Sequence, residues 1–166
     1  SIGFDGGNLA CSLASCGFVY TGCFGGQYLQ DFEGGPPLPI EFTTGGAANW
    51  VVDMGNPING SYSAWSTDLG EGQNNFMSIS ATFAAAGDIS FVHEESSEAT
   101  FDFLEFYIDG VLVDSWSGIN PPMMETYPVA AGVHDFEWRY DKDGVVSVGA
   151  DSVWVDDITL VPGVPI

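Results

Sequence analysis

The sequence predicts an all-β protein, an antiparallel two-sheet β-sandwich of the jelly-roll kind. Short apolar runs recur at near-regular spacing from residue 28 to residue 161, and clusters of Gly, Pro, Asn and Asp separate them. No segment has a convincing helical period. Roughly ten short strands in such a series are typical of sandwiches and jelly rolls. The chain of 166 residues is long enough to form one domain with a hydrophobic core.

The expected strands begin near residue 28 and continue almost to the C-terminus. In order, we expect strands at 28–33, 48–53, 61–66, 75–83, 88–95, 101–108, 111–116, 124–130, 133–140 and 152–161. The turn signals around them are Gly34-Gly35-Pro36-Pro37, Gly45-Gly46, Asn59-Gly60, Gly87-Asp88, Asp109-Gly110, Pro121-Pro122, Ala131-Gly132 and Asp143-Gly144. Asp109-Gly110 is the strongest of these signals, because a type I′ hairpin turn needs a positive φ at both central residues.

Side chains alternate between two faces along the longer runs. The clearest sets on one face are Met77, Ile79, Ala81 and Phe83, and then Phe136, Trp138 and Tyr140. Exposed aromatic side chains can serve as platforms for sugars, but beside aliphatic strands they are more often part of the core. We therefore expect these aromatic side chains to be buried.

The charge balance is strongly acidic and excludes several partners. The chain has 23 Asp and Glu residues against Arg139 and Lys142, for a formal net charge of −21. Two cations cannot form the basic patch that nucleic-acid binding needs, and anionic membrane surfaces are disfavoured for the same reason. No apolar run is long enough to span a membrane. The acidity suits a saline or Ca²⁺-rich exterior, or serves only to keep a secreted protein soluble.

Residues 1–28 differ in composition from the rest of the chain. They are rich in Gly, Ser, Ala and Cys, with a short β-prone run that includes Phe18, Val19 and Tyr20. We expect residues 1–28 to form an N-terminal arm, and residues 29–166 to form the jelly-roll domain. The first residues lack the pattern of an intact signal peptide, so we expect a processed or excised end.

The cysteines are confined to this arm, at Cys11, Cys16 and Cys23. Their spacing is not that of a zinc site, and no His lies nearby. An odd number in a secreted chain implies one disulfide and a free thiol, or a disulfide between chains. The pairing cannot be read from the sequence.

Several motifs from Asp31 onward resemble a large set of secreted bacterial modules, the MAM-like and cleaved-adhesin-like jelly rolls. The matching segments are Asp31-Phe32-Glu33, the runs 60–64, 102–110, 116–118 and 138–143, and the run from Ala150 to Ile158. Such modules are appended to proteases, glycosidases and adhesins alike. The resemblance therefore implies a secreted jelly roll, and it leaves the ligand unspecified.

The resemblance also implies a structural Ca²⁺ ion. In similar families an acidic residue near the first strand and one in the last strand jointly hold the ion. Carried over to this chain, the ligands would be Glu33 and Asp156, with Asp31 and Asp157 as helpers.

The residues themselves give partial support to a cation at Asp156. If Ile158 and Leu160 face the core, the two-residue period of a strand turns Asp156 inward as well. A buried carboxylate needs a compensating partner, and the chain has few basic side chains to offer. A hard cation with oxygen ligands would serve. The alternative is an Asp that accepts hydrogen bonds from main-chain N–H groups at a strand end.

A second acidic loop runs from Asp141 to Asp151. It resembles a calcium loop only in part, because it lacks the third Asp and the distal Glu of the helix-flanked type. Asp143-Gly144 is ordinary turn chemistry, so we favour a solvated turn over a metal site.

Catalytic motifs are absent from the sequence. There is no nucleophile elbow, no P-loop and no dinucleotide fingerprint, and His93-Glu94-Glu95 has no second His four residues on. A glycosidase would need two carboxyl groups across a cleft, and a small sandwich has few long loops to build one. Glu94, Glu95 and Glu98 are expected at a solvated strand end, where they could edge a ligand site. We do not expect an enzyme.

Two functions remain. The first is a non-catalytic extracellular or cell-surface module, stabilised by Ca²⁺, for adhesion or for binding a glycan or surface ligand. The alternative is a self-assembling subunit of an extracellular filament or tube. In that case the arm around Phe18, Val19 and Tyr20 would add a strand to a neighbouring copy.

Overall fold

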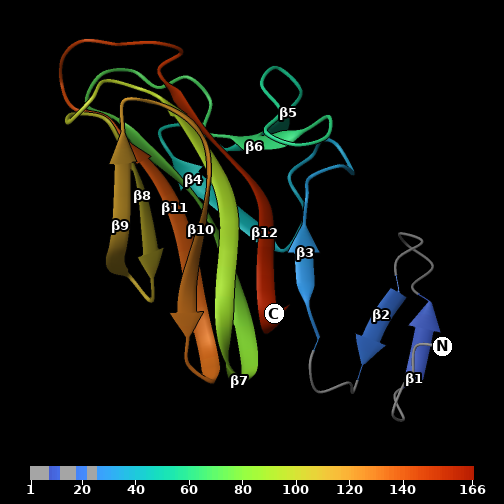
Figure 1. The fold of residues 1–166 in the computed structure, drawn as a ribbon. Helices are drawn as coiled ribbons and strands as arrows, with labels where there is room; N and C mark the ends of the chain where they lie inside the picture. The colour runs from blue at the N-terminus through green and yellow to red at the C-terminus, as the bar shows by residue number, and fades with distance from the viewer. Residues whose placement is uncertain (1–7, 12–17, 22–25) are drawn as a thin grey trace.

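The structure is a computed structural model that describes residues 8–11, 18–21 and 26–166, and it is built from β-strands (Figure 1). In chain order the strands are β1 (Asn8–Cys11), β2 (Phe18–Thr21), β3 (Tyr28–Gln30), β4 (Phe42–Gly46), β5 (Val51–Asp53), β6 (Ser63–Trp65), β7 (Asn74–Ser96), β8 (Phe103–Ile108), β9 (Val111–Ser117), β10 (Ile119–Val129), β11 (Gly132–Asp141) and β12 (Ser152–Pro165). All pairings are antiparallel. The predicted all-β class is therefore confirmed. Among the described residues, no helix could span a membrane.

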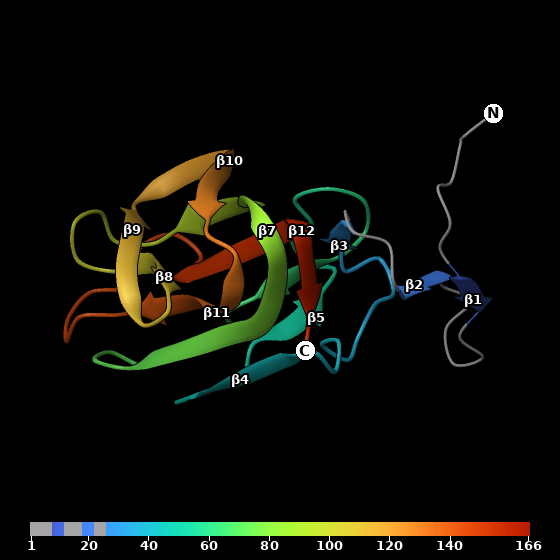
Figure 2. The same ribbon diagram turned by 90° about the horizontal axis from the view of Figure 1, so that it is seen from below.

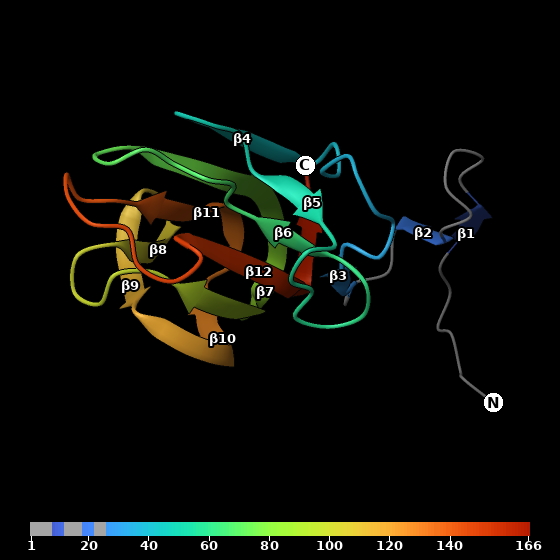
Figure 3. The same ribbon diagram turned by 90° about the horizontal axis from the view of Figure 1, so that it is seen from above.

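The 23-residue strand β7 joins the two layers of the sandwich. Its first half pairs with β4 and β11, and its second half pairs with β10 and β12. The first layer therefore has the order β4-β7-β11-β8-β9, and the second contains β10, β7, β12, β6 and β5, with β3 also paired to β12. Figures 2 and 3 view the molecule from its two ends and show β4 and β10 on opposite sides.

The core lies between these layers and holds the predicted aromatic side chains. Phe106, Phe136, Trp138 and Tyr140 are completely buried. The ring of Phe91 lies 5.3 Å from that of Trp138 and meets it edge to face. Such contacts are favourable arrangements of aromatic rings. The prediction that Phe136, Trp138 and Tyr140 form part of the core is confirmed.

The β8–β9 hairpin confirms the strongest turn signal. Ile108 pairs with Val111, and the two residues between them have φ angles of +53° at Asp109 and +73° at Gly110. Positive φ at both central residues is the geometry of a type I′ turn.

Three other predicted turns are wrong, because their residues lie inside strands. Gly45-Gly46 ends β4, a strand that the sequence analysis missed, and a Cβ at Gly45 would lie 2.9 Å from the Phe76 ring. Gly87 lies within β7, where a Cβ would lie 1.9 Å from the Val161 carbonyl oxygen. These glycines permit a close approach of neighbouring strands rather than a turn. Pro121-Pro122 lies in β10 at a register shift, a position where proline is tolerated.

The arm strands β1 and β2 pair with each other, in a two-stranded sheet separate from the main one. Phe18, Val19 and Tyr20 belong to β2 and pair with residues 9–11 of β1. The addition of this arm to a neighbouring copy stays a prediction. Cys16, Cys23 and the side chain of Cys11 lie outside the described residues, and so does their disulfide pairing.

Candidate functional site

The outer face of the second layer carries two tryptophans side by side. Trp154 of β12 pairs with Trp65 of β6 and with Glu94 of β7. Paired residues of an antiparallel sheet point to the same side, so these three side chains share one face. Their strand neighbours Val153 and Val155 point the other way, into the core.

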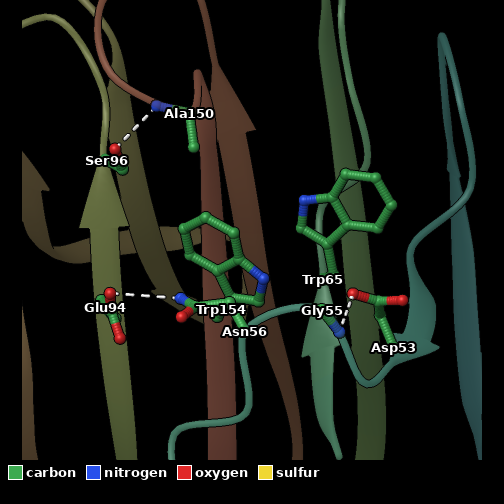
Figure 4. Close-up of a pocket in the computed structure, with 8 residues that line it drawn as sticks. All are labelled: Asp53, Gly55, Asn56, Trp65, Glu94, Ser96, Ala150 and Trp154. Carbon is green, nitrogen blue, oxygen red and sulfur yellow. Dashed lines mark hydrogen bonds between the residues drawn. The ribbon is translucent and has the colours of Figure 1, made fainter.

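These side chains line a pocket of about 460 Å³. Its lining residues are Asp53, Gly55, Asn56, Trp65, Glu94, Ser96, Ala150 and Trp154, shown in Figure 4. The floor comes from β6, β12 and β7, and the rim comes from β5, the loop after it and the loop before β12. A pocket of this size suits a small ligand or a few sugar units.

Hydrogen bonds hold the rim of the pocket in place. The Asn56 side-chain amide donates to Glu94 Oε1 at 3.2 Å, so the β5–β6 loop is tied to β7. The Gly55 N–H donates to Asp53 Oδ2 at 2.6 Å, and the Ala150 N–H donates to Ser96 Oγ at 2.8 Å. The polar groups of the pocket are therefore positioned before any ligand arrives.

Both indole nitrogens in the pocket lack a partner. The Nε1 atoms of Trp65 and Trp154 are shielded from solvent and have no hydrogen-bond acceptor among the described residues. A buried donor without an acceptor costs about 1–3 kcal/mol.

The pocket combines aromatic faces with carboxylate and amide groups. An aromatic face accepts the apolar C–H face of a sugar ring, and the carboxylates of Asp53 and Glu94 accept hydrogen bonds from hydroxyl groups. Polar groups held at fixed places beside aromatic side chains give a small-ligand site its specificity.

Only part of this pocket is predictable from the sequence. Glu94 was expected to edge a ligand site, and it does line the pocket. Glu95 was expected at the same solvated strand end, but it is completely buried and pairs with His93. The signal that separates them is alternation, since His93 and Glu95 share the inner face of β7 and Glu94 points outward. Trp65 and Asp53 were missed, because no local pattern shows that β5 and β6 lie beside β12.

The predicted cation ligand Glu33 lies against the loop between β5 and β6. Its Oε1 accepts hydrogen bonds from the N–H groups of Ser61 at 2.7 Å and Tyr62 at 3.0 Å. These main-chain donors lower the pKa of Glu33 below its ordinary value. Gly60 has a φ of +65°, and a Cβ there would lie 2.3 Å from Glu33 Oε1. Glycine therefore allows this close contact.

Asp156 reaches the same loop from β12. It is completely buried, and its Oδ2 accepts from Asn59 N–H at 3.2 Å and from Ser63 Oγ at 3.0 Å. Its Oδ1 accepts from Asp157 N–H at 2.8 Å. Burial nevertheless raises the pKa of Asp156 to about 6, because the loss of hydration outweighs these hydrogen bonds.

The predicted orientation of Asp156 is wrong. Asp156 pairs with Val92 on the outer face of the second layer, whereas Ile158 and Leu160 belong to the core. A register shift follows Asp156, and Asp157 has a φ of +49°. This bulge reverses the alternation, so Asp156 is buried beneath the loop and not in the core.

Glu33, Asp156 and Asp157 thus contact one loop, and protein donors occupy much of their hydrogen-bonding capacity. Among the described residues, no three of the four predicted ligands bring their oxygens within 4.8 Å of one another. Asp31 Oδ1 accepts from the Glu33 N–H at 3.1 Å, and Asp157 Oδ2 accepts from the Asn59 side chain. The residues fit a hard cation in donor chemistry, since all four offer carboxylate oxygens. The N–H contacts equally fit the alternative of a hydrogen-bonded Asp at a strand end. Calcium at Glu33 and Asp156 stays a prediction.

Comparisons with known proteins place the fold. No protein-family model and no curated protein matches the chain. Among solved structures, the K3 cleaved adhesin domain of Lys-gingipain from Porphyromonas gingivalis superposes with a TM-score of 0.58, at 11% identity, over 81% of this chain and 97% of that one.

Two carbohydrate-binding modules are similar to a comparable degree. TmCBM61 in complex with β-1,4-galactotriose has a TM-score of 0.56 at 15% identity, covering 79% of this chain and 94% of that one. The CBM22-1 xylan-binding domain of Xyn10C from Paenibacillus barcinonensis has a TM-score of 0.53 at 14% identity, covering 81% and 92%. Identities this low establish the fold alone. The fold is that of a cleaved-adhesin-like jelly-roll module.

Proposed function

We propose that this chain is a non-catalytic extracellular module that binds a glycan through the pocket of Trp65 and Trp154. The observation that carries the proposal is the pair of neighbouring indoles in one pocket with Asp53, Asn56 and Glu94. Structures of the same fold that are described as xylan-binding or as bound to galactotriose support a carbohydrate ligand in general. Adhesion to a cell surface would follow if that surface displays the glycan.

The charge of the pocket narrows the class of glycan. Asp53 and Glu94 both line it, neither cation of the chain does, and the net charge is −21. An anionic sugar such as a uronic acid would be repelled at the pocket and at the surface around it. The ligand is therefore a neutral or amino-substituted oligosaccharide.

Calcium belongs to the proposal as a structural ion. Glu33 and Asp156 would hold the ion between the start of the sandwich and its last strand. The ion would reinforce the hydrogen bonds by which these two residues already fix the 59–63 loop. This loop follows the rim of the Trp pocket, so an ion here would stiffen the region beside the ligand. The ion would supply positive charge and no reaction chemistry.

An oligosaccharide array followed by calorimetry tests the function. The probes are neutral and amino-substituted oligosaccharides, including β-1,4-galactotriose and xylo-oligosaccharides, beside acidic ones. We expect binding to a neutral or amino-substituted sugar, weakened by about tenfold or more in Trp65→Ala, which corresponds to about 1.4 kcal/mol. Trp65→Phe, which keeps an aromatic face, should lose less.

Phe101→Ala is the matched control, because Phe101 is an exposed aromatic outside the pocket. Its affinity should equal that of the parent chain. The proposal fails if neither a neutral nor an amino-substituted oligosaccharide binds, or if Trp65→Ala binds like the parent. Hydrolysis of a bound sugar would contradict the non-catalytic role.

A further inference from the structure

A second group of carboxylates lies at one end of the sandwich. Glu98 and Asp102 belong to the loop between β7 and β8, and Asp143 belongs to the loop between β11 and β12. One oxygen from each of the three lies within 4.8 Å of the other two. Both loops are at the top of Figure 1. The Asp143 N–H donates to Asp102 Oδ1 at 3.0 Å, which ties the loops together.

This group contains buried carboxylate oxygens without partners. Asp102 is completely buried, and its Oδ2 has no hydrogen-bond donor among the described residues. The Oε2 atom of Glu98 is likewise shielded from solvent and without a donor there. Leaving charged oxygens buried and unpaired is costly, so protonation, water or a cation must compensate them at this place.

Burial and mutual repulsion both act on the carboxyl groups of this cluster. Desolvation raises the pKa of Asp102 above its ordinary value. Desolvation also raises the pKa of Glu98, and repulsion from Asp143, Asp102 and Glu71 raises it further. The carboxylates therefore repel one another in the absence of a cation.

The nearby Lys142 attracts Asp102 through space, but its direct contacts are with other residues. The Lys142 ammonium is completely buried, contacts Asp151, and donates to Ser147 Oγ at 3.2 Å and to Leu69 O at 3.4 Å. Its contact with Glu71 is 3.8 Å. The other cation of the chain, Arg139, pairs with Glu137. One buried ammonium thus serves a region with five carboxylates.

We propose that Glu98, Asp102 and Asp143 bind a calcium ion. The donor set contains only oxygen, which suits a hard cation, and Ca²⁺–O distances of about 2.3–2.6 Å allow two ligand oxygens to lie up to about 5 Å apart. Mg²⁺ needs shorter bonds and stricter octahedral geometry. Water and main-chain carbonyls would complete the coordination. The sequence favoured a solvated turn at Asp143-Gly144, and the Val145 N–H does donate to Asp143 Oδ1 at 2.8 Å. The proposal adds a cation to this turn.

Calcium titration of the chelator-treated full chain tests this site, and calorimetry measures ion binding. The titration extends to about 10 mM Ca²⁺, which exceeds the Kd values of weak extracellular calcium sites. We expect Glu98→Gln, which keeps the shape of the side chain and removes its charge, to weaken binding at one site by about tenfold or more. Asp88→Asn is the control, because Asp88 is an exposed carboxylate on strand β7 and lies outside the group. It should bind like the parent.

Amide NMR of the unmutated chain gives a readout that does not depend on a variant's folding. Calcium should shift the amide signals of Asp102 and Asp143, since the Asp143 N–H bonds to a proposed ligand. The proposal is overturned if the parent binds no calcium, if Glu98→Gln binds like the parent, or if shifts are confined to residues 59–63. That last result would place the ion at Glu33 and Asp156 instead.

Discussion

Asp156 is the residue at which burial and hydrogen bonding compete most clearly. Three donors, Asn59 N–H, Ser63 Oγ and Asp157 N–H, stabilise its charged form. Its complete burial favours the neutral form, and the pKa of about 6 shows that burial dominates. Without a cation, Asp156 therefore lowers the stability of the folded state at neutral pH.

This balance predicts a pH dependence in calcium-free buffer with chelator. The pKa of Asp156 is about 6 in the folded state and 3.8 in the unfolded state. Asp156 therefore contributes favourably to the free energy of unfolding below pH 4, and this contribution is lost as the pH rises through 6. The difference corresponds to about 3 kcal/mol in the free energy of unfolding. Urea denaturation of the parent and of Asp156→Asn between pH 4 and 7 measures it. The parent should lose more stability over this range, and equal losses would contradict the account.

At the scale of elements, β7 organises the sandwich because it belongs to both layers. Its inner face changes from aliphatic and aromatic residues to the buried pair of His93 and Glu95. The Asn120 side chain donates to Glu95 Oε2 at 3.0 Å, and the ring of Trp116 lies 4.1 Å from that of His93. The polar end of the core is thus enclosed by β9 and β10.

The adjacent strand β11 offers a test of the aromatic core. Trp138 is completely buried and packs 5.3 Å from both Phe91 and Phe106. Trp138→Ala should lower the free energy of unfolding by about 3–5 kcal/mol, as large-to-small changes in a core do. Val133→Ala, an exposed site on the same strand, should change it by less than about 0.5 kcal/mol. Normal stability of Trp138→Ala would show that the side chain is not part of the core.

Local patterns in the sequence predicted the elements better than their arrangement. Alternation identified the buried aromatics of β11, and Asp109-Gly110 identified the β8–β9 hairpin, because both depend on neighbouring residues. The same reasoning failed at Gly87, where glycine allows β12 to approach, and at Asp156, where a bulge reverses the alternation. Each of these features depends on a partner strand far away in the sequence.

The candidate site was harder to predict for the same reason. Its floor combines Trp65, Trp154 and Glu94 from three strands that are adjacent only in the folded sheet. Glu98, Asp102 and Asp143 likewise come from two loops separated by the whole of β8 to β11. The sequence indicated acidic residues in both regions, and only the fold shows which of them meet.

For the whole molecule, the net charge of −21 makes the stability of the folded state depend on cation binding. Carboxylates gather at two places, around the 59–63 loop and at the Glu98 group, while the chain has only two basic side chains. A bound divalent ion reduces local repulsion and joins segments that are distant in sequence. The folded state, which alone assembles these oxygens, is then stabilised by mass action.

We therefore predict that calcium raises the melting temperature. Free Ca²⁺ at 100 times its Kd contributes about 2.7 kcal/mol per site, or roughly 5–10 °C for a domain of this size. Thermal melts with calcium, with chelator and with NaCl of equal ionic strength measure the effect. Comparison of Asp156→Asn with Glu98→Gln assigns it to one site or the other. A melting curve that chelator leaves unchanged would rule out a structural ion.

Binding of a glycan in the pocket of Trp65 and Trp154 can be followed by indole N–H NMR, during titration with the oligosaccharide that binds best. The chain has five tryptophans, each with its own indole signal. We predict that the signals of Trp65 and Trp154 shift in proportion to binding. The signal of Trp50, whose Nε1 donates to Asn75 Oδ1 at 2.9 Å in the protein interior, should stay in place. If the sugar saturates the protein while the Trp65 and Trp154 signals do not move, the glycan does not bind in this pocket.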